Sequence, residues 1–238
     1  MPSLAPNPQR LARLAGLLYL AIIVLGIGAE LAIRAPLIVP GDAAATAANV
    51  LAHQGLFRLG LAADAAMALC DVALALLLYA LLRPAGPLLA MTATAFRLVQ
   101  TAVIAANLLN FNAALMLLTR GEALGGLDAA QRETLAMLAL ENHGIGYDIG
   151  LAFFALNCLI LGLLLFRSGY FPRLLGPLMG VAGLVYLTGS SLRLLAPGLY
   201  EAFSPAYGLC LLAELSLCLW LLIRGVNMAR WPAQARVS

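Results

Sequence analysis

Six long runs of apolar residues set the tightest limit on how this chain can fold. A helix that crosses the ~30 Å hydrocarbon core of a bilayer needs roughly 20 mostly apolar residues. Six stretches of the chain meet that requirement, namely residues 14–33, 57–82, 87–118, 145–166, 174–195 and 207–223. They predict an all-α integral membrane protein, a six-transmembrane-helix bundle in which residues 1–238 form a single multipass membrane domain.

The composition supports this class and excludes several others. Apolar residues make up 63% of the chain and charged residues only 11%, whereas an ordinary soluble domain carries about 25% charged residues. This difference excludes a soluble globular enzyme, a disordered tail and a nucleic-acid-binding module, so we expect no nucleic-acid partner. All 14 cationic residues are arginines, and a chain without lysine cannot form a Schiff base with a substrate or a pigment.

The arginines predict the orientation of the spans, because cytoplasmic loops of membrane proteins carry an excess of positive charge. With the N-terminus in the cytoplasm, the cytoplasmic segments contain no acid and eight arginines, which are Arg10, Arg13, Arg83, Arg167, Arg173, Arg224, Arg230 and Arg236. The opposite side then holds seven acids, which are Glu30, Asp42, Glu122, Asp128, Glu133, Glu141 and Glu201. Both termini are therefore predicted to be cytoplasmic. The same arginines suit the anionic headgroups of membrane lipids, which we expect as partners.

Two segments on the outer side are long enough to fold into short extracytoplasmic helices. The first is predicted to begin after Asp42, a favourable N-cap residue, and to end near Gly55. In the second, Asp128 and Gln131 have the spacing of a capping box. That box would open an amphipathic helix reaching to about Asn142.

Four stretches of the chain resemble the bacterial membrane protein family called domain of unknown function 4386. They are residues 40–46, residues 52–58, Phe96-Arg97-Leu98-Val99-Gln100, and Arg167-Ser168-Gly169-Tyr170-Phe171-Pro172-Arg173-Leu174-Leu175-Gly176. The resemblance covers nearly the whole chain, and its last stretch is the most specific part. It implies a bacterial multipass membrane protein, and it implies no activity and no site residues. We expect the bundle to lie in the bacterial inner membrane.

Five polar side chains from five spans are predicted to lie at one depth in the membrane. Counting about 1.5 Å per residue from the predicted cytoplasmic helix ends places them roughly 15–18 Å up, near the midplane. They are Asp71, Arg97, Asn157, Tyr186 and Glu214. Ionisable groups inside a span are costly and by default mark a function or a structural pair.

The chemistry at that depth predicts a ligand-binding site. Arg97 cannot lose its proton, so it needs a carboxylate, and Asp71 and Glu214 are the two available. Whichever acid is left over would hold a proton or attract a cation. The alternative is a buried ion pair that only holds three helices together.

A second set of polar residues is predicted closer to the outer face. It consists of Asp64, Asn107, Asp148, Ser190 and Arg193, roughly 24–30 Å up by the same count. We expect Asp64 and Asn107 to extend the ligand site, because a polar stripe from the midplane to the surface can line a water-filled cavity open to the outer side.

Two histidines offer the alternative of a metal site. His53 and His143 lie on the outer side, and with Asp148 they would supply two imidazoles and a carboxylate. The spacing matches no established zinc signature, so we expect no metal and no other cofactor.

Three glycines of the fifth predicted span, Gly176, Gly180 and Gly183, indicate close helix packing.

The sequence leaves three functional hypotheses. The first is binding or transport of a small-molecule or lipid ligand, with Arg97 as its anchor and Asp71 or Glu214 as the titrating acid. The second is a metal-dependent membrane enzyme acting on lipid at the outer face. The third is a structural or regulatory subunit, and assembly into a homo-oligomer is compatible with all three.

Overall fold

The structure is a computed structural model that describes residues 7–120 and 125–232. Within these ranges it consists of helices and turns and contains no strand. Glu122 and Arg236, two of the charges that predict the orientation, lie outside the described residues.

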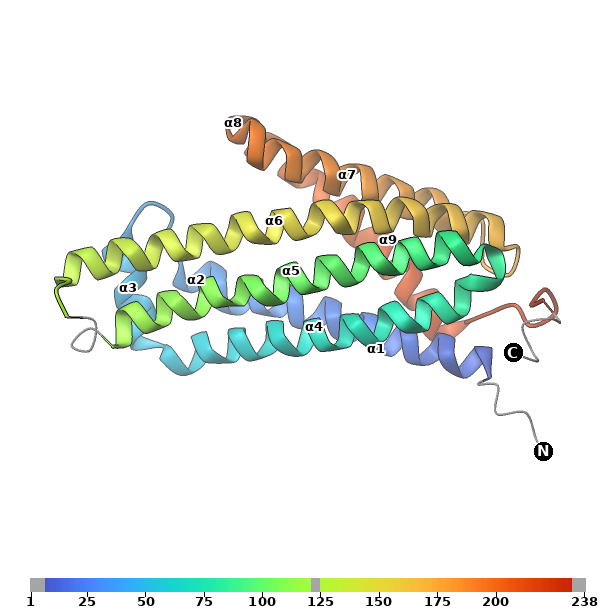
Figure 1. The fold of residues 1–238 in the computed structure, drawn as a ribbon, viewed down its shortest axis with the longest axis horizontal. Helices are drawn as coiled ribbons and strands as arrows, with labels where there is room; N and C mark the ends of the chain where they lie inside the picture. The colour runs from blue at the N-terminus through green and yellow to red at the C-terminus, as the bar shows by residue number, and fades with distance from the viewer. Residues whose placement is uncertain (1–6, 121–124, 233–238) are drawn as a thin grey trace. The chain divides into compact units, whose positions relative to one another are not determined.

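Six helical spans in the described part of the chain are long and apolar enough to cross a membrane. The helices are α1 (Pro8–Ala29), η1 (Glu30–Arg34) and α2 (Ala35–Leu37) in the first span, α4 (Gln54–Leu82) and η2 (Arg83–Ala85) in the second, α5 (Pro87–Thr119) in the third, α6 (Ala129–Ser168) in the fourth, α7 (Leu175–Leu195) in the fifth, and α8 (Pro197–Phe203), η4 (Ser204–Ala206) and α9 (Tyr207–Ile223) in the sixth (Figure 1). The expected all-α architecture is confirmed, and the chain is a multispan membrane protein.

The first span contains a five-residue π-helical turn, η1, between α1 and α2. Pro36 follows this turn. It has no N–H to donate to the carbonyl of Ala32, and in a regular helix its ring would clash with that carbonyl. A wider turn relieves the clash. Within this turn, Nε of Arg34 lies 2.6 Å from the carboxylate of Glu30.

The first short outer helix forms as the sequence predicts. It is α3 (Ala43–Ala52), and Oδ1 of Asp42 accepts a hydrogen bond from the backbone N–H of Ala45 at 2.9 Å. This cap satisfies one of the amide groups that a helix N-terminus leaves without a partner.

The second outer helix begins as predicted but does not end where we expected. Asp128 and Gln131 each accept the other's backbone N–H, at 3.0 and 2.8 Å, so the capping box is confirmed. The expected end near Asn142 is wrong, because the helix continues into the fourth span as the 40-residue α6. Gly144 and Gly146 do not stop it, since a glycine costs a helix only about 1 kcal/mol and the segment contains no proline.

The chain divides into two compact units. Unit 1 contains Met1–Ala21, Cys70–Thr101 and Asp148–Ser238, and unit 2 contains Ile22–Leu69 and Ala102–Tyr147. The expectation of a single domain stays a prediction.

In unit 1, α6 and α7 approach each other closely at glycines. A Cβ atom on Gly162 would lie 2.6 Å from the carbonyl oxygen of Gly176, and one on Gly183 would lie 2.8 Å from that of Ala155. The prediction of close packing is therefore confirmed for Gly176 and Gly183. Gly180 also takes part in this contact, because a Cβ atom on Gly162 would lie 3.0 Å from its backbone nitrogen, although a Cβ atom on Gly180 itself would meet nothing within 4 Å.

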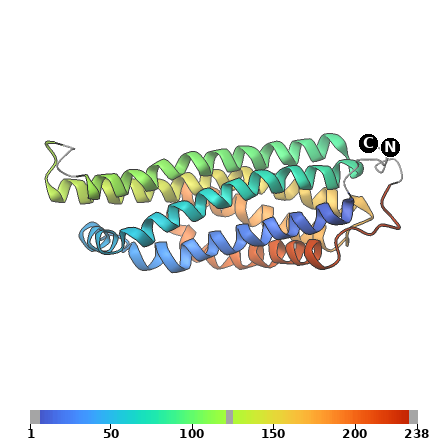
Figure 2. The same ribbon diagram turned by 90° about the horizontal axis from the view of Figure 1, so that it is seen from below.

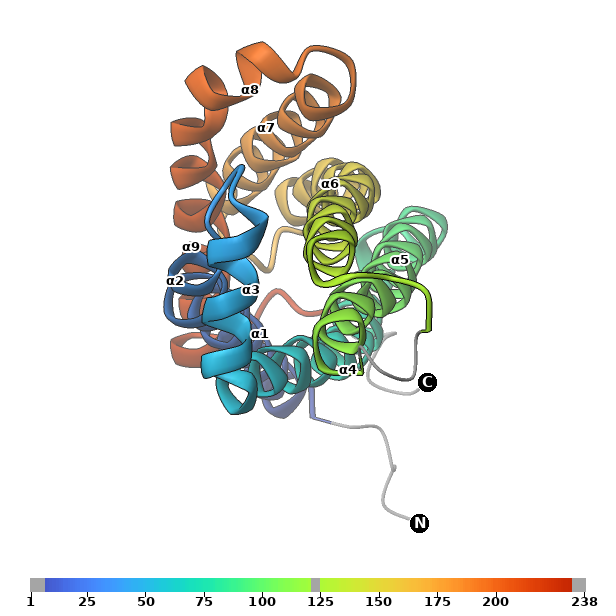
Figure 3. The same cartoon turned by 90° about the vertical axis from the view of Figure 1, so that its left-hand side faces the viewer.

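Helix α7 and the first part of α1 pack along α9 in unit 1. Helix α7 lies beside α9, and α8 joins the two (Figure 3). The first part of α1 also runs along α9 (Figure 2), where Sγ of Cys218 lies 3.4 Å from the carbonyl oxygen of Gly16. Unit 1 thus contains the start of the first span, the end of the second, the start of the third, the end of the fourth, and the fifth and sixth spans.

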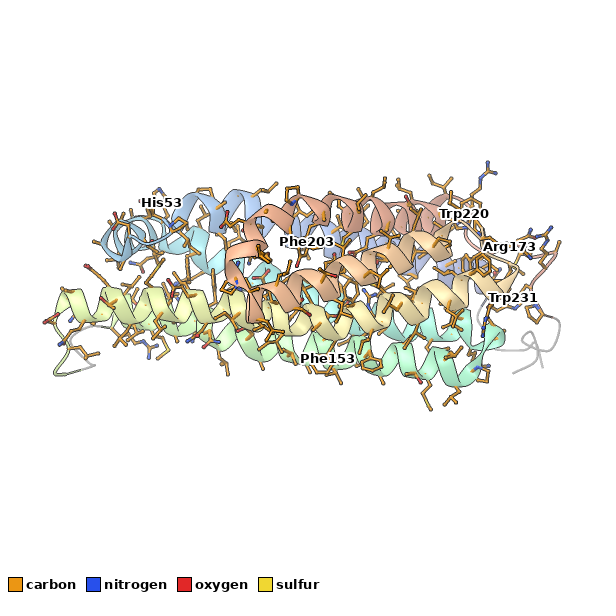
Figure 4. The ribbon with its side chains drawn as sticks, turned by 90° about the horizontal axis from the view of Figure 1, so that it is seen from above. His53, Phe153, Arg173, Phe203, Trp220 and Trp231 are labelled. Carbon is orange, nitrogen blue, oxygen red and sulfur yellow. The ribbon has the colours of Figure 1, made fainter. Side chains whose placement is uncertain are left out.

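One end of unit 1 carries the described arginines of the predicted cytoplasmic side, and we call it the basic end. Its arginines are Arg10, Arg13, Arg83, Arg167, Arg173, Arg224 and Arg230. Arg173, Trp220 and Trp231 lie near one another at this end in Figure 4.

A buried tyrosine fastens the loop between α6 and α7 at the basic end. Gly169, with a φ of +73°, ends α6 in the left-handed conformation that glycine adopts easily. The next residue, Tyr170, donates its hydroxyl hydrogen to the carbonyl of Leu81 at 2.9 Å. Its ring meets Trp231 edge-on, with the ring centroids 4.8 Å apart. This loop belongs to the stretch that carried the strongest family resemblance.

Unit 2 is organised around two stacked aromatic rings. The rings of Phe57 and Phe111 are parallel, with centroids 4.0 Å apart. The other buried apolar residues of this core are Ile33, Leu37, Val50, Ala114, Leu115, Ala136 and Leu140.

Candidate functional site

The ion pair between Arg97 and Asp71 is the centre of the polar group in unit 1. Nε and Nη2 of Arg97, on α5, lie 2.9 and 2.5 Å from Oδ1 of Asp71, on α4. Thr101, one turn further along α5, donates its hydroxyl hydrogen to Oδ2 of Asp71. Of the two carboxylates available to Arg97, the structure therefore selects Asp71 and occupies both of its oxygens.

Two aromatic rings enclose the guanidinium group. Cζ of Arg97 lies 5.4 Å from the ring centroid of Tyr19 and 5.1 Å from that of Phe154. A cation over an aromatic face gains attraction from the ring electrons, and the gain grows when water is excluded. Arg97 is only 1% exposed, so the ion pair and these rings form a closed, electrically neutral unit.

Glu214, the second acid, is held by phenols instead of by a cation. Its Oε1 accepts a hydrogen bond from the hydroxyl of Tyr186 at 2.5 Å, and its Oε2 accepts one from Tyr19 at 3.2 Å. The donors come from α7 and α1, and Glu214 lies on α9. No ion pair of Glu214 is found among the described residues.

A small cavity lies beside the ion pair. Its volume is about 10 Å³, and its lining includes Arg97 and Asn157, which leaves space for a group about the size of one water molecule. The other lining residues are Ala75, Leu78, Tyr79, Leu82, Ala90, Ala93, Thr94, Leu161 and Leu164. Because Leu82, Ala90 and Leu164 lie near the helix termini of the basic end, the cavity is on that side of Arg97.

Two polar atoms of the cavity's lining residues have no hydrogen-bond partner. They are the donor Nη1 of Arg97 and the acceptor Oδ1 of Asn157. The amide nitrogen of Asn157 is used, since it donates to the carbonyl of Ala93 at 2.8 Å, and the residue is 3% exposed. Buried polar atoms are nearly always bonded, so such exceptions need an explanation.

A row of polar and aromatic side chains extends away from Glu214 within unit 1. The ring of Tyr186 meets that of Tyr207 edge-on at 5.6 Å, and Tyr207 meets Tyr200 at 6.3 Å. Arg193 lies over Tyr200 at 4.8 Å and is 3.5 Å from the carboxylate of Asp148. Asp148 therefore forms an ion pair with Arg193 of α7, and it does not line the cavity with Asn157.

Asp64 and Asn107, the remaining residues expected at the ligand site, belong to unit 2. Oδ2 of Asp64 accepts a hydrogen bond from Nη1 of Arg34 at 2.5 Å. The amide nitrogen of Asn107 donates to the carbonyl of His143 at 2.7 Å, and its oxygen accepts from Asn110 at 2.9 Å. Both residues therefore have structural partners inside unit 2.

The two histidines have unrelated surroundings. His53 is exposed at the end of α3, with Nδ1 3.1 Å from the carbonyl of Asn49. His143 is buried, and its Nδ1 lies 3.2 Å from the amide nitrogen of Asn107. Within residues 7–120 and 125–232, no group of three or more His, Cys, Asp and Glu side chains could hold a metal ion.

Sequence reasoning missed three residues of the polar group, namely Tyr19, Thr101 and Phe154. Thr101 had a usable signal, because it stands four residues after Arg97 and therefore on the same helix face. Tyr19 is the one tyrosine of the first apolar run, and a phenol inside a span needs a hydrogen-bond partner. Phe154 gave no signal, since a phenylalanine in a span is ordinary.

Comparisons with known proteins point to a family and to no activity. A family model described as "Domain of unknown function (DUF4386)" matches residues 14–225. An uncharacterized protein of Archaeoglobus fulgidus is 25% identical over 163 residues, which are 67% of this chain and 79% of that protein. No solved structure matches the chain.

Proposed function

We propose, for a chain that belongs to the family described as domain of unknown function 4386, that this membrane protein binds a small or amphiphilic ligand at a polar site among its spans, as a binding or transport protein. The observation that carries the proposal is the cavity lined by Arg97 and Asn157. A donor and an acceptor without partners occur together at its buried lining residues. A ligand group that accepts from one and donates to the other would satisfy both.

The size of the cavity limits which part of a ligand enters it. A volume of about 10 Å³ admits a single oxygen-sized group, such as one oxygen of a carboxylic acid, a phosphate or an alcohol. Nη1 of Arg97 would bind that oxygen, and Oδ1 of Asn157 would accept its hydrogen where it carries one. The rest of the ligand must lie along the helices, so binding requires the spans to separate locally.

The ion pair with Asp71 gives Arg97 a defined position without using all of its donors. Two of its five N–H groups, one on Nε and one on Nη2, point to Oδ1 of Asp71, while Nη1 has no partner. A purely structural pair is the alternative role. The unpaired atoms favour a ligand, because leaving a buried donor or acceptor unpaired costs about 1–3 kcal/mol.

The cavity does not support the expectation from the sequence that the ligand site opens to the outer side. Its lining residues include Leu82 and Leu164, near the basic end. Asp64 and Asn107, which would have extended the site outward, have partners of their own in unit 2. The direction of access stays a prediction.

The experiment asks whether a small molecule co-purifies with the full-length protein and depends on Asn157. The protein is extracted from bacterial membranes in mild detergent, and the compounds it releases on denaturation are identified by mass spectrometry. Asn157→Ala removes the acceptor and leaves the Arg97–Asp71 pair intact. Asn112→Ala is the matched control, because it makes the same change on α5, in unit 2 and outside the cavity lining.

We expect one compound to accompany the wild type and Asn112→Ala in nearly equal amounts. Asn157→Ala should retain about a tenth of it or less, because a lost hydrogen bond to a charged or buried group is worth about 1.4 kcal/mol or more. Equal amounts in all three proteins, or no compound in any of them, would contradict the proposal.

A further inference from the structure

Glu214 is the one acid of the unit 1 polar group whose charge no cation in contact balances. Arg97 donates two hydrogen bonds to Asp71, and the opposite charges of the two side chains cancel. Glu214 receives two hydrogen bonds from phenols, and phenols carry no positive charge. An ionised carboxylate inside a membrane span is costly unless it is paired. One added proton would make the whole group neutral.

The groups around Glu214 come from all the helices packed against it. Tyr19 of α1, Asp71 of α4, Arg97 of α5 and Tyr186 of α7 lie within electrostatic range of it. Cys158 of α6 and Cys210 of α9 itself complete the set. Arg97 is the one cation in this set, and it is committed to Asp71.

Glu214 does not share hydrogen bonds with the ion pair. Its two oxygens are bonded to Tyr186 and Tyr19 and not to Arg97 or Asp71. Glu214 can therefore bind a proton without opening the Arg97–Asp71 contact.

Hydroxyl groups continue from Tyr186 toward the far end of α7. Ser190 follows Tyr186 by four residues, on the same helix face. The hydroxyl oxygens of Ser190 and Tyr207 are both buried and lack a hydrogen-bond partner. Tyr207 occupies the space that a side chain on Gly189 would fill. Hydroxyl groups pass protons by accepting one hydrogen bond and donating another.

The last members of the row are ionisable and closer to the surface. Tyr200 packs against Tyr207, and the half-buried Arg193 lies over Tyr200 and beside Asp148. Asp148 itself is buried, and the half-buried Arg193 beside it is where the row meets solvent. A proton passes there onto Asp148 and from it into the row.

We infer that Glu214 is a proton-binding site, and that the row Tyr186, Ser190, Tyr207, Tyr200 and Asp148 is the path by which its proton exchanges with the solvent. The step is a proton transfer alone. A proton enters at Asp148, moves through hydroxyl groups and water, and binds an oxygen of Glu214, which becomes a neutral carboxylic acid. The inference stands on Glu214 and its neighbours and does not require the ligand proposed for the cavity.

The test is infrared spectroscopy of the purified full-length protein in lipid vesicles. A protonated carboxyl group has a carbonyl band distinct from that of a carboxylate, and the band shifts when its hydrogen is replaced by deuterium. We expect the wild type to show such a band with a pH-dependent amplitude. Glu214→Gln should lose it, whereas Glu201→Gln, the same change at an exposed position of α8, should keep it.

The path is tested by the rate at which the band shifts after transfer to deuterated buffer. Tyr207→Phe removes one hydroxyl from the row and should slow the shift about tenfold or more. Ser191→Ala, which removes an exposed hydroxyl of α7 outside the row, should leave the rate unchanged. An unchanged rate in Tyr207→Phe would overturn the path.

A second variant covers the case in which Glu214→Gln does not fold. Tyr186→Phe keeps the carboxyl group and removes the 2.5 Å hydrogen bond to its Oε1, so the carbonyl band should move to higher frequency. A band that persists in Glu214→Gln, or one that does not move in Tyr186→Phe, would overturn the assignment to Glu214. Neither readout depends on a co-purifying compound, so failure of the ligand proposal would leave these results unaffected.

Discussion

At Arg97, protein groups replace the water that a guanidinium group would otherwise hold. Asp71 supplies the opposite charge, and Thr101 donates a hydrogen bond to the second oxygen of that carboxylate. The rings of Tyr19 and Phe154 cover the guanidinium group. A buried pair of this kind often contributes little net stability, because removing two charges from water costs about as much as their attraction gains. Removing only one partner is different, since the remaining charge is then buried alone.

The single variant Asp71→Asn should therefore be strongly destabilising, by about 3–5 kcal/mol. The double variant Arg97→Met and Asp71→Leu should recover most of that loss. Thr101 would not be left without a partner there, because its hydroxyl also lies 2.9 Å from the carbonyl of Arg97. Thermal unfolding in detergent measures both effects. A double variant as unstable as Asp71→Asn would show that the ion pair itself is needed for folding.

The sequence could predict that Arg97 needs a carboxylate but could not choose between Asp71 and Glu214. Both acids stand at one predicted depth, and depth follows from counting residues along a helix. The choice depends on how each helix is rotated about its axis and on which rotamer each side chain adopts. Neither is visible in one sequence. The same limit explains why Asp148 could be placed at a depth but not assigned to Arg193.

At the scale of helices, the contact between α6 and α7 depends on glycines that face the partner backbone. An added methyl group on Gly162 would meet the backbone of Gly176, which cannot move aside as a flexible side chain can. Gly180 lies on the same contact turn of α7, yet its own Cβ direction is open. The two positions therefore form a matched pair.

Gly162→Ala should lower the free energy of unfolding by about 1–3 kcal/mol, the usual cost of overpacking. Gly180→Ala should be neutral or stabilising by up to about 1 kcal/mol, because alanine is the better helix former. Chemical denaturation of the two variants beside the wild type gives the comparison. Equal losses in both would mean that helix propensity or lipid contact, and not backbone proximity, decides the effect.

Element boundaries were less predictable than the elements themselves. The spacing of Asp128 and Gln131 correctly marked the start of α6, because a capping box is a local interaction. The end expected near Asn142 was wrong, since whether a helix continues past two glycines is decided by packing. Gly146 lies against the side chain of Asn107, a contact between helices that the local sequence does not encode. The π-helical turn at Glu30–Arg34 was also missed.

The loop between α6 and α7 should make stability sensitive to alkaline pH through Tyr170. Burial raises the pKa of the Tyr170 hydroxyl above its usual value. The folded state then keeps this proton at a pH where the unfolded chain has lost it. Its contribution to stability is full below a pH of about 10, and it falls as the pH rises toward the folded pKa, by up to about 1.4 kcal/mol per pH unit.

The variant Tyr170→Phe separates this effect from other alkaline effects. At neutral pH it should be less stable by about 1 kcal/mol, because it loses the hydrogen bond to the carbonyl of Leu81. Above a pH of about 10 its stability should fall less steeply than that of the wild type. Melting temperatures across that range, with Tyr79→Phe as the control, measure the difference. Parallel curves for wild type and Tyr170→Phe would contradict the assignment.

At the scale of the whole molecule, the segregation of charge is the feature that orients the chain. The seven described arginines of the predicted cytoplasmic side all belong to unit 1, at its basic end. Moving them to the outer side would oppose the positive-inside rule. It would also remove them from the negative surface potential of the cytoplasmic leaflet, which attracts each juxtamembrane arginine by about 1 kcal/mol.

Reporter fusions at Gly86 and Gly125 test this orientation. Gly86 lies between η2 and α5, at the basic end, and Gly125 lies in the connection between α5 and α6. Alkaline phosphatase, which is active only outside the cytoplasm, should be active when fused at Gly125 and inactive at Gly86, and a fluorescent protein that folds only in the cytoplasm should give the reverse.

The opposite pattern would have a specific consequence for the site. Arg97, Glu214 and their hydrogen bonds would be unchanged, because they depend on packing within unit 1 alone. The proton path from Glu214 to Asp148 leads away from the basic end. Arg167 and Arg173 mark the basic end of the fourth and fifth spans, whereas Asp148 and Arg193 lie toward the opposite ends of these spans. With the predicted orientation, Glu214 therefore exchanges protons with the outer side. With an external Gly86, the same path would open to the cytoplasm, and protons would reach the site from inside the cell.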